Sequence, residues 1–373
     1  MSTRSLLVFV LVLSSITRSI TAAENSVDQA VDRGIAFLEN RGQNPDGSFS
    51  PHTGVAVTAL VVQAVLRHRP AATKEAWVRN ALAFIESNVR SDGGIHAPDS
   101  RHRNYETAVA ISALVRANDD GRYDDTLERA EYFLRGIQWD EGEGVESSDT
   151  AYGGAGYGSH SRPDLSNTAF MIDALKDLGN GEDDESIRKA LRFVLRTQNL
   201  PADEAGGIGN DTRHGGKVGD GGFYYTPAAG GESKAGETDG GGLRSYGSMT
   251  YAGLKSMIYA GLTADDPRVV AAMNFIRDHY SLDSNPGMGA AGLYYYYHTF
   301  AKALDAADVD VLTDSDGERH RWRDELIDAV TSKQQDEGSW INERNDRWME
   351  GDRQLVTAYA LLTLAHARGE LGR

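Results

Sequence analysis

The stretch Arg129-Ala-Glu-Tyr-Phe-Leu134, followed by Gln138 and Gly142, decides the fold, because its pattern returns along the chain. Each copy is an amphipathic helix that ends at a glutamine or another polar residue and is followed by a glycine turn. The helical segments are 27–40, 75–89, 127–137, 187–197, 269–280 and 325–333. A glutamine at a helix end can bond backbone groups that lack a helical partner, and glycine permits the left-handed turn that stops a helix.

A second kind of helix follows each turn and is apolar almost all round. These segments are 55–66, 107–115, 168–178, 250–260, 294–304 and 355–367. A threonine marks a common register in five of them, and Tyr297 fills the same position in the fifth copy. The five threonines are Thr58, Thr107, Thr168, Thr250 and Thr357. An apolar helix of this kind is buried, whereas the first kind keeps a polar outer face, so each unit pairs an outer helix with an inner one.

Two helices cannot bury such an inner helix alone, so neighbouring units must stack. Six pairs form either an open solenoid or a closed ring, and closure is favoured because neither terminal unit has the polar face of a cap. The predicted fold is therefore an all-α (α/α)6 toroid of six outer/inner helix pairs in one domain, residues 24–373. Glycine-rich insertions at 141–162 and 200–242 and an acidic one at 308–318 interrupt the repeat.

The first 23 residues have the layout of a secretory signal peptide. Arg4 supplies a positive charge, residues 6–13 are an unbroken apolar run, and Thr21-Ala22-Ala23 offers small residues for cleavage before Glu24. The run is too short to span a bilayer, and no other stretch approaches the roughly 20 apolar residues that a membrane helix needs. We expect an exported protein, periplasmic or secreted after cleavage, without a membrane span.

Charge and cysteine content exclude several classes of function. The chain has a formal net charge of −17 and no cysteine. Because a protein with this much negative charge repels phosphate backbones, nucleic acid is not an expected partner. The missing cysteine excludes thiol nucleophiles and thiolate metal ligands, and stability must come from a large core in place of disulfides.

The repeat resembles that of squalene cyclases and protein prenyltransferases, which share a terpenoid cyclase-like α/α toroid. Their repeat reads basic, small, two variable residues, aromatic and aliphatic, then glutamine, glycine and an aromatic. The segment 129–142 matches this pattern, 189–198 repeats its first half, 334–340 repeats its second half, and 33–49 matches with one extra residue. The resemblance covers essentially the whole mature chain. It implies the architecture, because the repeated residues have structural roles.

The catalytic signatures of those enzymes are absent from the sequence. There is no Asp-x-Asp-Asp motif of the kind with which squalene cyclases protonate an alkene. There is also no cysteine for the prenyltransferase zinc site, although His298 lies at a position similar to that of a zinc-ligand histidine in those enzymes. We therefore expect no metal and no cofactor, and the resemblance alone transfers no activity.

Candidate site residues are those near the starts of the inner helices, which converge on one mouth of a toroid. The predicted ligand-binding residues there are Arg244, Tyr246, Tyr294, Tyr297, His298 and Trp348. Asp173 lies inside an inner helix where no cap explains it, and is the general-acid candidate unless Arg244 or His298 pairs with it. Glu106 and Asp352 are further catalytic candidates that equally fit first-turn acids favoured by the helix dipole.

Three functions follow from this arrangement. The first is an exported cyclase- or prenyltransferase-like protein that binds, or transforms, an isoprenoid-like or other apolar ligand in a central aromatic-lined cavity. The second is a secreted glycan-active or glycan-binding toroid, with Glu106, Asp164 and Asp352 as the pool for an acid and base pair. The third is a non-catalytic scaffold that holds a partner protein.

Overall fold

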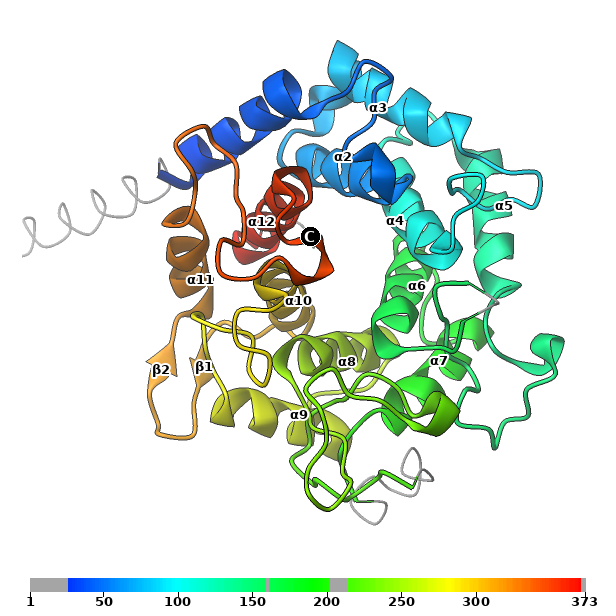
Figure 1. Cartoon of the computed structure of the whole chain (residues 1–373), viewed down its shortest axis with the longest axis vertical. Helices are drawn as coiled ribbons and strands as arrows, with labels where there is room; N and C mark the ends of the chain where they lie inside the picture. The colour runs from blue at the N-terminus through cyan, green and yellow to red at the C-terminus, as the bar shows by residue number, and fades with distance from the viewer. Residues whose placement is uncertain (1–25, 159–160, 202–212, 370–373) are drawn as a thin grey trace, which may run out of the picture.

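The computed structural model describes residues 26–158, 161–201 and 213–369, so the predicted signal segment 1–23 lies outside the described residues. Six helices lie inside the molecule and follow one another around its centre (Figure 1). They are α2 (Ala56–His68), α4 (Arg103–Arg116), α6 (Leu165–Asp177), α8 (Gly247–Tyr259), α10 (Leu293–Ala306) and α12 (Arg353–Ala367). Each packs on the next, and α12 packs back on α2, which closes the ring.

A second set of helices surrounds this ring and alternates with the inner helices along the chain (Figure 1). It comprises residues 26–37, α3 (Ala76–Ser87), α5 (Asp124–Arg135), α7 (Glu185–Arg196), α9 (Pro267–Asp278) and α11 (Trp322–Thr331). The short helical turns are η1 (Leu38–Gly42), η2 (Pro51–Thr53), η3 (Pro70–Lys74), η4 (Glu141–Glu143), η5 (Ala228–Gly230) and η6 (Arg347–Met349). The predominantly helical class is confirmed. The acidic insertion, predicted as a loop, also forms a small antiparallel hairpin of β1 (Leu312–Thr313) and β2 (Arg319–His320).

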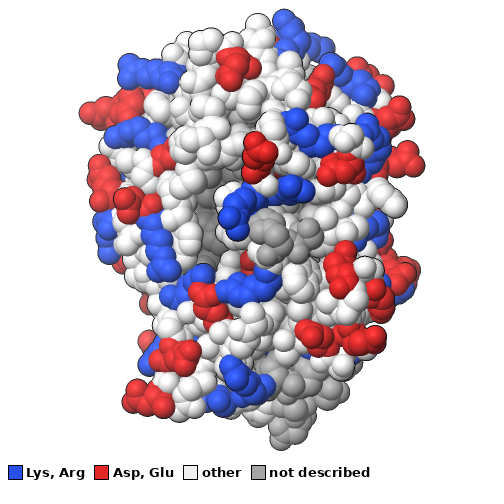
Figure 2. Space-filling view, turned by 45° about the vertical axis from the view of Figure 1, so that its right-hand side comes forward, with Lys and Arg blue, Asp and Glu red and all other residues white. Residues whose placement is uncertain are grey.

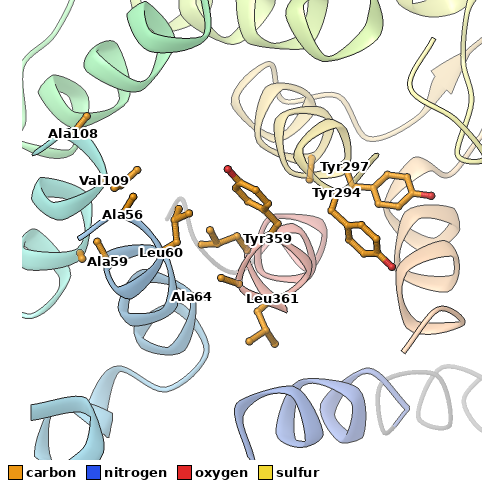
Figure 3. Packing of buried hydrophobic residues seen from close by; sticks show 14 of the residues in the cluster. Ala56, Ala59, Leu60, Ala64, Ala108, Val109, Tyr294, Tyr297, Tyr359 and Leu361 are labelled. Atoms are coloured by element: carbon orange, nitrogen blue, oxygen red, sulfur yellow. The ribbon is translucent and has the colours of Figure 1, made fainter. Parts of the chain in front are cut away.

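The inner helices are buried nearly all round, as their apolar sequences predict. In α2, every residue from Ala56 to Arg67 is buried, and in α12 burial runs from Leu355 to Ala367. Figure 3 shows Ala56 and Ala59 of α2 facing Ala108 and Val109 of α4, while Leu361 of α12 points toward the outer helix of residues 26–37. Small side chains let the axes approach, and the larger ones restore close packing.

In four of the six units, a repeated glutamine joins the unit to the next outer helix. Each side-chain Nε2 donates to two backbone oxygens, one of a turn glycine and one early in the following outer helix. The pairs are Gln43 with Gly47 and Trp77, Gln138 with Gly153 and Ser186, Gln198 with Gly221 and Arg268, and Gln334 with Gly338 and Ala30. The last pair links the final unit to the first outer helix, so the same device closes the ring.

The turn glycines are required by conformation and by space. Gly47, Gly153, Gly221 and Gly338 all have positive φ. A Cβ added at any of them would lie 1.9–2.5 Å from a backbone oxygen of the next outer helix, closer than any side chain can approach. One residue of the predicted pattern is corrected here. Gly142, expected to be the turn glycine after Gln138, lies in the insertion at η4, and Gly153 takes its place because residues 140–152 are inserted between them.

The threonines in the inner helices accept hydrogen bonds from the backbone just after the glycine turns. In five units the threonine Oγ1 accepts the N–H of the residue two positions after the turn glycine, at 2.9–3.1 Å. The donors are Phe49, Ile95, Ala155, Phe223 and Trp340. Because the turn lies on the outer side of the inner helix, these bonds fix which side of each inner helix faces away from the centre.

Candidate functional site

A central cavity of about 360 Å³ lies among the first turns of the inner helices. All six inner helices contribute to its wall, each with the residue two positions before the threonine or its equivalent. These residues are Ala56, Tyr105, Ser166, Ser248, Tyr295 and Leu355. Two residues along an α-helix correspond to a rotation of about 200°. The threonine side faces the turn, so this position faces the centre of the ring.

Aromatic side chains dominate the described wall of the central cavity. They are Tyr105, Tyr157, Phe170, Tyr225, Tyr246, Tyr295, Trp348 and Tyr359. Figure 3 shows Tyr359 projecting from α12 into the space that the inner helices enclose. Aromatic faces provide a large apolar surface and also attract cations, so this wall suits an apolar chain or a ligand that carries positive charge.

Four of these rings form an aromatic layer across the ring of helices, defined as Tyr105, Phe170, Tyr295 and Tyr359. The ring centroids of Tyr105 and Phe170 are 4.8 Å apart, those of Phe170 and Tyr295 6.1 Å, and those of Tyr295 and Tyr359 6.0 Å. The Tyr105 and Tyr359 hydroxyls are 3.2 Å apart. Burial raises the pKa of Tyr105 to about 12, and it also raises the pKa values of Tyr295 and Tyr359. The layer is therefore uncharged at physiological pH.

The mouth of the cavity is bordered by side chains from loops. Trp348 and Met349 both have positive φ, which is rare for residues other than glycine and places a strained segment at the rim. The Arg347 guanidinium lies 4.3 Å from the centre of the Trp348 ring, and the Lys234 ammonium lies 4.6 Å from the centre of the Tyr225 ring. Figure 2 shows a hollow on one face of the molecule with Lys and Arg side chains beside it.

Glu350 is the one carboxyl group on the described wall of the cavity. Its Oε1 accepts the N–H groups of Tyr294 and Tyr295, each at 2.9 Å, and its Oε2 accepts Nδ2 of Asn342 at 2.6 Å. Burial raises the pKa of Glu350 to about 7, although these hydrogen bonds oppose the shift. A carboxyl group with such a pKa can donate or accept a proton at neutral pH.

Asp173, the predicted general acid, lies below the aromatic layer and pairs with two lysines through one of its two oxygens. Its Oδ2 accepts from Nζ of Lys255 at 2.6 Å and from Nζ of Lys302 at 2.8 Å. Burial alone would raise the pKa of Asp173, but the two ammonium groups outweigh it and lower the pKa. This direction is opposite to what a general acid requires. The partners are the two lysines and not Arg244 or His298, which the sequence had suggested.

Glu106 and Asp352 lie outside the cavity wall. The buried Glu106 carboxylate accepts the N–H groups of Val55 and Ala97, each at 2.9 Å, and so fixes the loops that lead into α2 and α4. Asp352 caps α12 by accepting the N–H of Gln354 at 2.8 Å. Asp352 is thus the N-cap of α12, one position before the first turn in which the alternative interpretation placed it.

The predicted ligand-binding residues divide into two groups. Tyr246 and Trp348 line the central cavity. Figure 3 shows the rings of Tyr294 and Tyr297 pointing away from the enclosed space, toward the outer helices. Tyr297 occupies the position of the threonines, which faces outward. Arg244 is exposed and donates to the carbonyl of Glu237 at 3.1 Å.

His298 lies deeper than the central cavity, beside a second hollow. It is buried, and desolvation together with the charge of Lys302 holds its pKa well below the ordinary value, so the imidazole is neutral. The ring stacks on Tyr359 at a centroid distance of 5.7 Å.

Three wall residues, Ser166, Phe170 and Tyr359, were missed at the sequence level although a signal for them existed. Ser166 precedes the threonine position by two, and Phe170 and Tyr359 follow it by two. Each of these positions is about 200° away from the threonine, on the side that faces the centre. The positions of the threonines, which the sequence shows, therefore already indicated which residues of the inner helices face the cavity.

One group of side chains in the described part of the chain has a spacing that suits a metal ion. Asp314, Glu318 and His320 lie together at the β1–β2 hairpin. Both His320 nitrogens already contact carboxylates, Nε2 at 3.2 Å from Asp314 and Nδ1 at 3.0 Å from Glu325. These contacts define an ion-pair cluster, and none of its members lines the central cavity.

Comparison with known proteins bears on the fold. No profile of a known protein family matches the chain, and no curated protein matches its sequence. Among solved structures, a point variant of the type II terpene cyclase MstE from Scytonema is similar with a TM-score of 0.55 and 13% identity, over 94% of this chain and 99% of that one. The unmodified MstE is similar with a TM-score of 0.51 and 15% identity, over 92% and 99%. The chain therefore has a terpene cyclase-like fold.

Among the described residues, no helix is both long enough and apolar enough to cross a bilayer.

Proposed function

We propose that this protein binds an isoprenoid-like apolar ligand in its central cavity. The observation that carries the proposal is the wall itself, in which eight aromatic side chains surround a space of about 360 Å³. Ligand pockets typically have volumes of about 300–1,000 Å³, with apolar and aromatic walls and few polar groups. The terpene cyclase-like fold supports the same ligand class by analogy.

The position of the acids favours this ligand over a glycan substrate. Hydrolysis of a glycosidic bond uses two carboxyl groups on opposite sides of that bond. Among the described wall residues, Glu350 has no second carboxyl group to face it. Of the pool expected for a glycan site, Glu106 holds loop backbone and Asp352 caps α12. Asp164 caps α6 by accepting the N–H of Asn167 at 2.9 Å.

The proposal includes the architecture and the location that the sequence predicts. We assign the closed ring of inner helices with its outer set to the (α/α)6 toroid class, as one domain spanning 24–373. We further propose that residues 1–23 are removed on export. Intact-mass analysis of protein collected from outside the cytoplasm tests this, because a mature chain should begin at Glu24. A chain that keeps its first residues, or stays in the cytoplasm, would contradict it.

Binding of farnesol, measured by quenching of tryptophan fluorescence, tests the ligand class. Trp348 lies on the cavity wall, so saturable quenching is expected. Ala56→Phe places a large ring at the wall and should weaken binding roughly tenfold or more, since well-packed sites tolerate added volume poorly. Val270→Phe, on the exposed side of α9, adds a comparable volume far from the cavity and should leave binding unchanged. Absence of quenching, or equal loss in both variants, would refute the proposal.

A further inference from the structure

A second hollow lies directly below the central cavity and is lined by charged side chains. It has a volume of about 10 Å³, enough for about one water molecule. The two hollows share Phe170 and Tyr295 as wall residues, so these two rings of the aromatic layer separate them. Below them lie Asp173, Lys255, His298 and Lys302, among other residues.

The charges around this hollow do not balance. Lys255 and Lys302 both contact the single Asp173 carboxylate, and their side chains are only 4% and 7% exposed. His298 beside them is neutral, because its pKa lies well below the ordinary value. The residues that line the hollow thus carry one net positive charge in a desolvated place, which is costly for a protein to maintain without a counter-charge.

Neighbouring carboxylates do not compensate for this charge. Asp177 lies 3.8 Å from Arg116, and Asp305 lies 2.9 Å from Arg323, so each already has its own cation. Arg67 is buried with no carboxylate oxygen within 4 Å in the described part of the chain, and so adds to the positive charge. The interior is electropositive although the whole chain has a net charge of −17.

Two buried polar atoms at the hollow remain available for hydrogen bonds. Asp173 Oδ1 and His298 Nδ1 have no hydrogen-bond partner among the described residues. Both residues are only 5% exposed. Buried polar groups in proteins are nearly always satisfied. The His298 Nδ1 can donate to an anion when it carries the ring proton, whereas Asp173 Oδ1 only accepts and needs a donor.

We propose that Lys255 and Lys302 form an anion subsite at the floor of the central cavity, and that the ligand is an apolar chain ending in a single carboxylate. This inference rests on the proposed function and specifies its ligand class. Lys302 follows Tyr295 by seven residues on α10, which places it about 10 Å deeper along the helix axis. The carboxylate reaches it when the rings of Phe170 and Tyr295 part, which requires the hydrogen bond between Ser166 and Tyr295 to break.

The size and charge of the floor favour a carboxylate over a diphosphate. One carboxylate neutralises the single excess charge of the lining residues and can accept from both ammonium groups, as Asp173 already does. A diphosphate carries more negative charge than this site balances, and although both groups exceed the water-sized hollow, the diphosphate exceeds it by far more.

The experiment compares the affinities of farnesoic acid, farnesol and farnesyl diphosphate for the purified protein. We expect farnesoate to bind roughly tenfold or more tightly than the other two, as charge-assisted hydrogen bonds predict. Lys302→Met should remove most of this preference and leave farnesol binding unchanged, and Lys302→Arg should keep it. Lys74→Met removes an exposed ammonium group outside both hollows and is the matched control, for which the preference should persist.

Stability measurements distinguish an anion subsite from a purely structural ion pair. Lys302→Met leaves a neutral pair of Asp173 and Lys255, so without ligand the variant should unfold at or above the temperature of the wild type. The subsite is refuted if farnesoate and farnesol bind equally, if farnesyl diphosphate binds most tightly, or if Lys74→Met abolishes the preference. Failure of all three ligands to bind would instead refute the proposed function, and the subsite with it.

Discussion

Gln334→Met should destabilise the protein by about 2 kcal/mol, because this glutamine joins the last unit to the first. Its Nε2 donates to the carbonyls of Ala30 and Gly338, both at 2.8 Å. Methionine keeps the length and removes both donors. Each lost hydrogen bond costs about 1 kcal/mol, and the Gly338 oxygen loses a partner in a partly buried place. For a chain of this size, 2 kcal/mol corresponds to a fall of about 3 °C in Tm.

The neighbouring glutamine provides a matched control. Gln335 donates only a long 3.4 Å contact to the carbonyl of Lys333, so Gln335→Met should change stability by less than about 0.5 kcal/mol. Urea unfolding followed by circular dichroism, together with calorimetric Tm values, measures both variants. Equal destabilisation of the two variants, or an unchanged Gln334→Met variant, would refute the role given to the repeated glutamines.

Three further predictions concern single residues. Burial raises the pKa of Glu350 from 4.5 to about 7, so its protonated carboxyl group stabilises the fold below about pH 4.5, and about 3 kcal/mol of that stabilisation is lost as the pH rises to 7. In urea unfolding from pH 4 to 8, the free energy of unfolding of Glu350→Gln should therefore vary less with pH than that of the wild type. A constant difference between the two proteins would be evidence against burial of the acid. At His320, burial lowers the pKa, but hydrogen bonds to two carboxylates raise it overall. The stabilisation of the fold by the protonated imidazole is therefore present below pH 6.5 and is lost as the pH rises through the raised pKa. An NMR titration that places this pKa below 6.5 would contradict the ion-pair cluster. Gly338→Ala should lower the free energy of unfolding in urea by about 3 kcal/mol or more, because φ is +96° and an added Cβ would lie 2.4 Å from a backbone oxygen. Gly317 also has positive φ but open space around it, so Gly317→Ala should cost only about 1 kcal/mol. Similar costs in the two variants would show that the close approach at Gly338 is unimportant.

The sequence predicts the helix pairs because burial and turn chemistry repeat at recognisable positions. In four units the glutamine donates to the turn glycine, and the threonine accepts from the residue two positions after that glycine, so these residue types recur at a regular spacing where no insertion intervenes. Insertions break this spacing, which is why Gly142 was mistaken for the turn glycine in place of Gly153. A pattern that allows a variable loop between glutamine and glycine would have placed the turn correctly.

The candidate site was predicted less well, because residue type alone does not tell which way a side chain points. Tyr294 to Tyr297 are chemically identical neighbours, yet of these four only Tyr295 lines the cavity, since its position is opposite to the outward-facing one. Asp173 was correctly placed in the interior of an inner helix. Its partners come from α8 and α10, at sequence separations of 82 and 129 residues that no local pattern encodes.

The most direct test of the central claim is a crystal structure of the mature chain with farnesol. The account predicts electron density for one farnesol molecule inside the central cavity, in contact with Phe170, Tyr295 and Trp348. Density only on the outer surface, or a cavity that excludes farnesol at concentrations that saturate the fluorescence change, would contradict it.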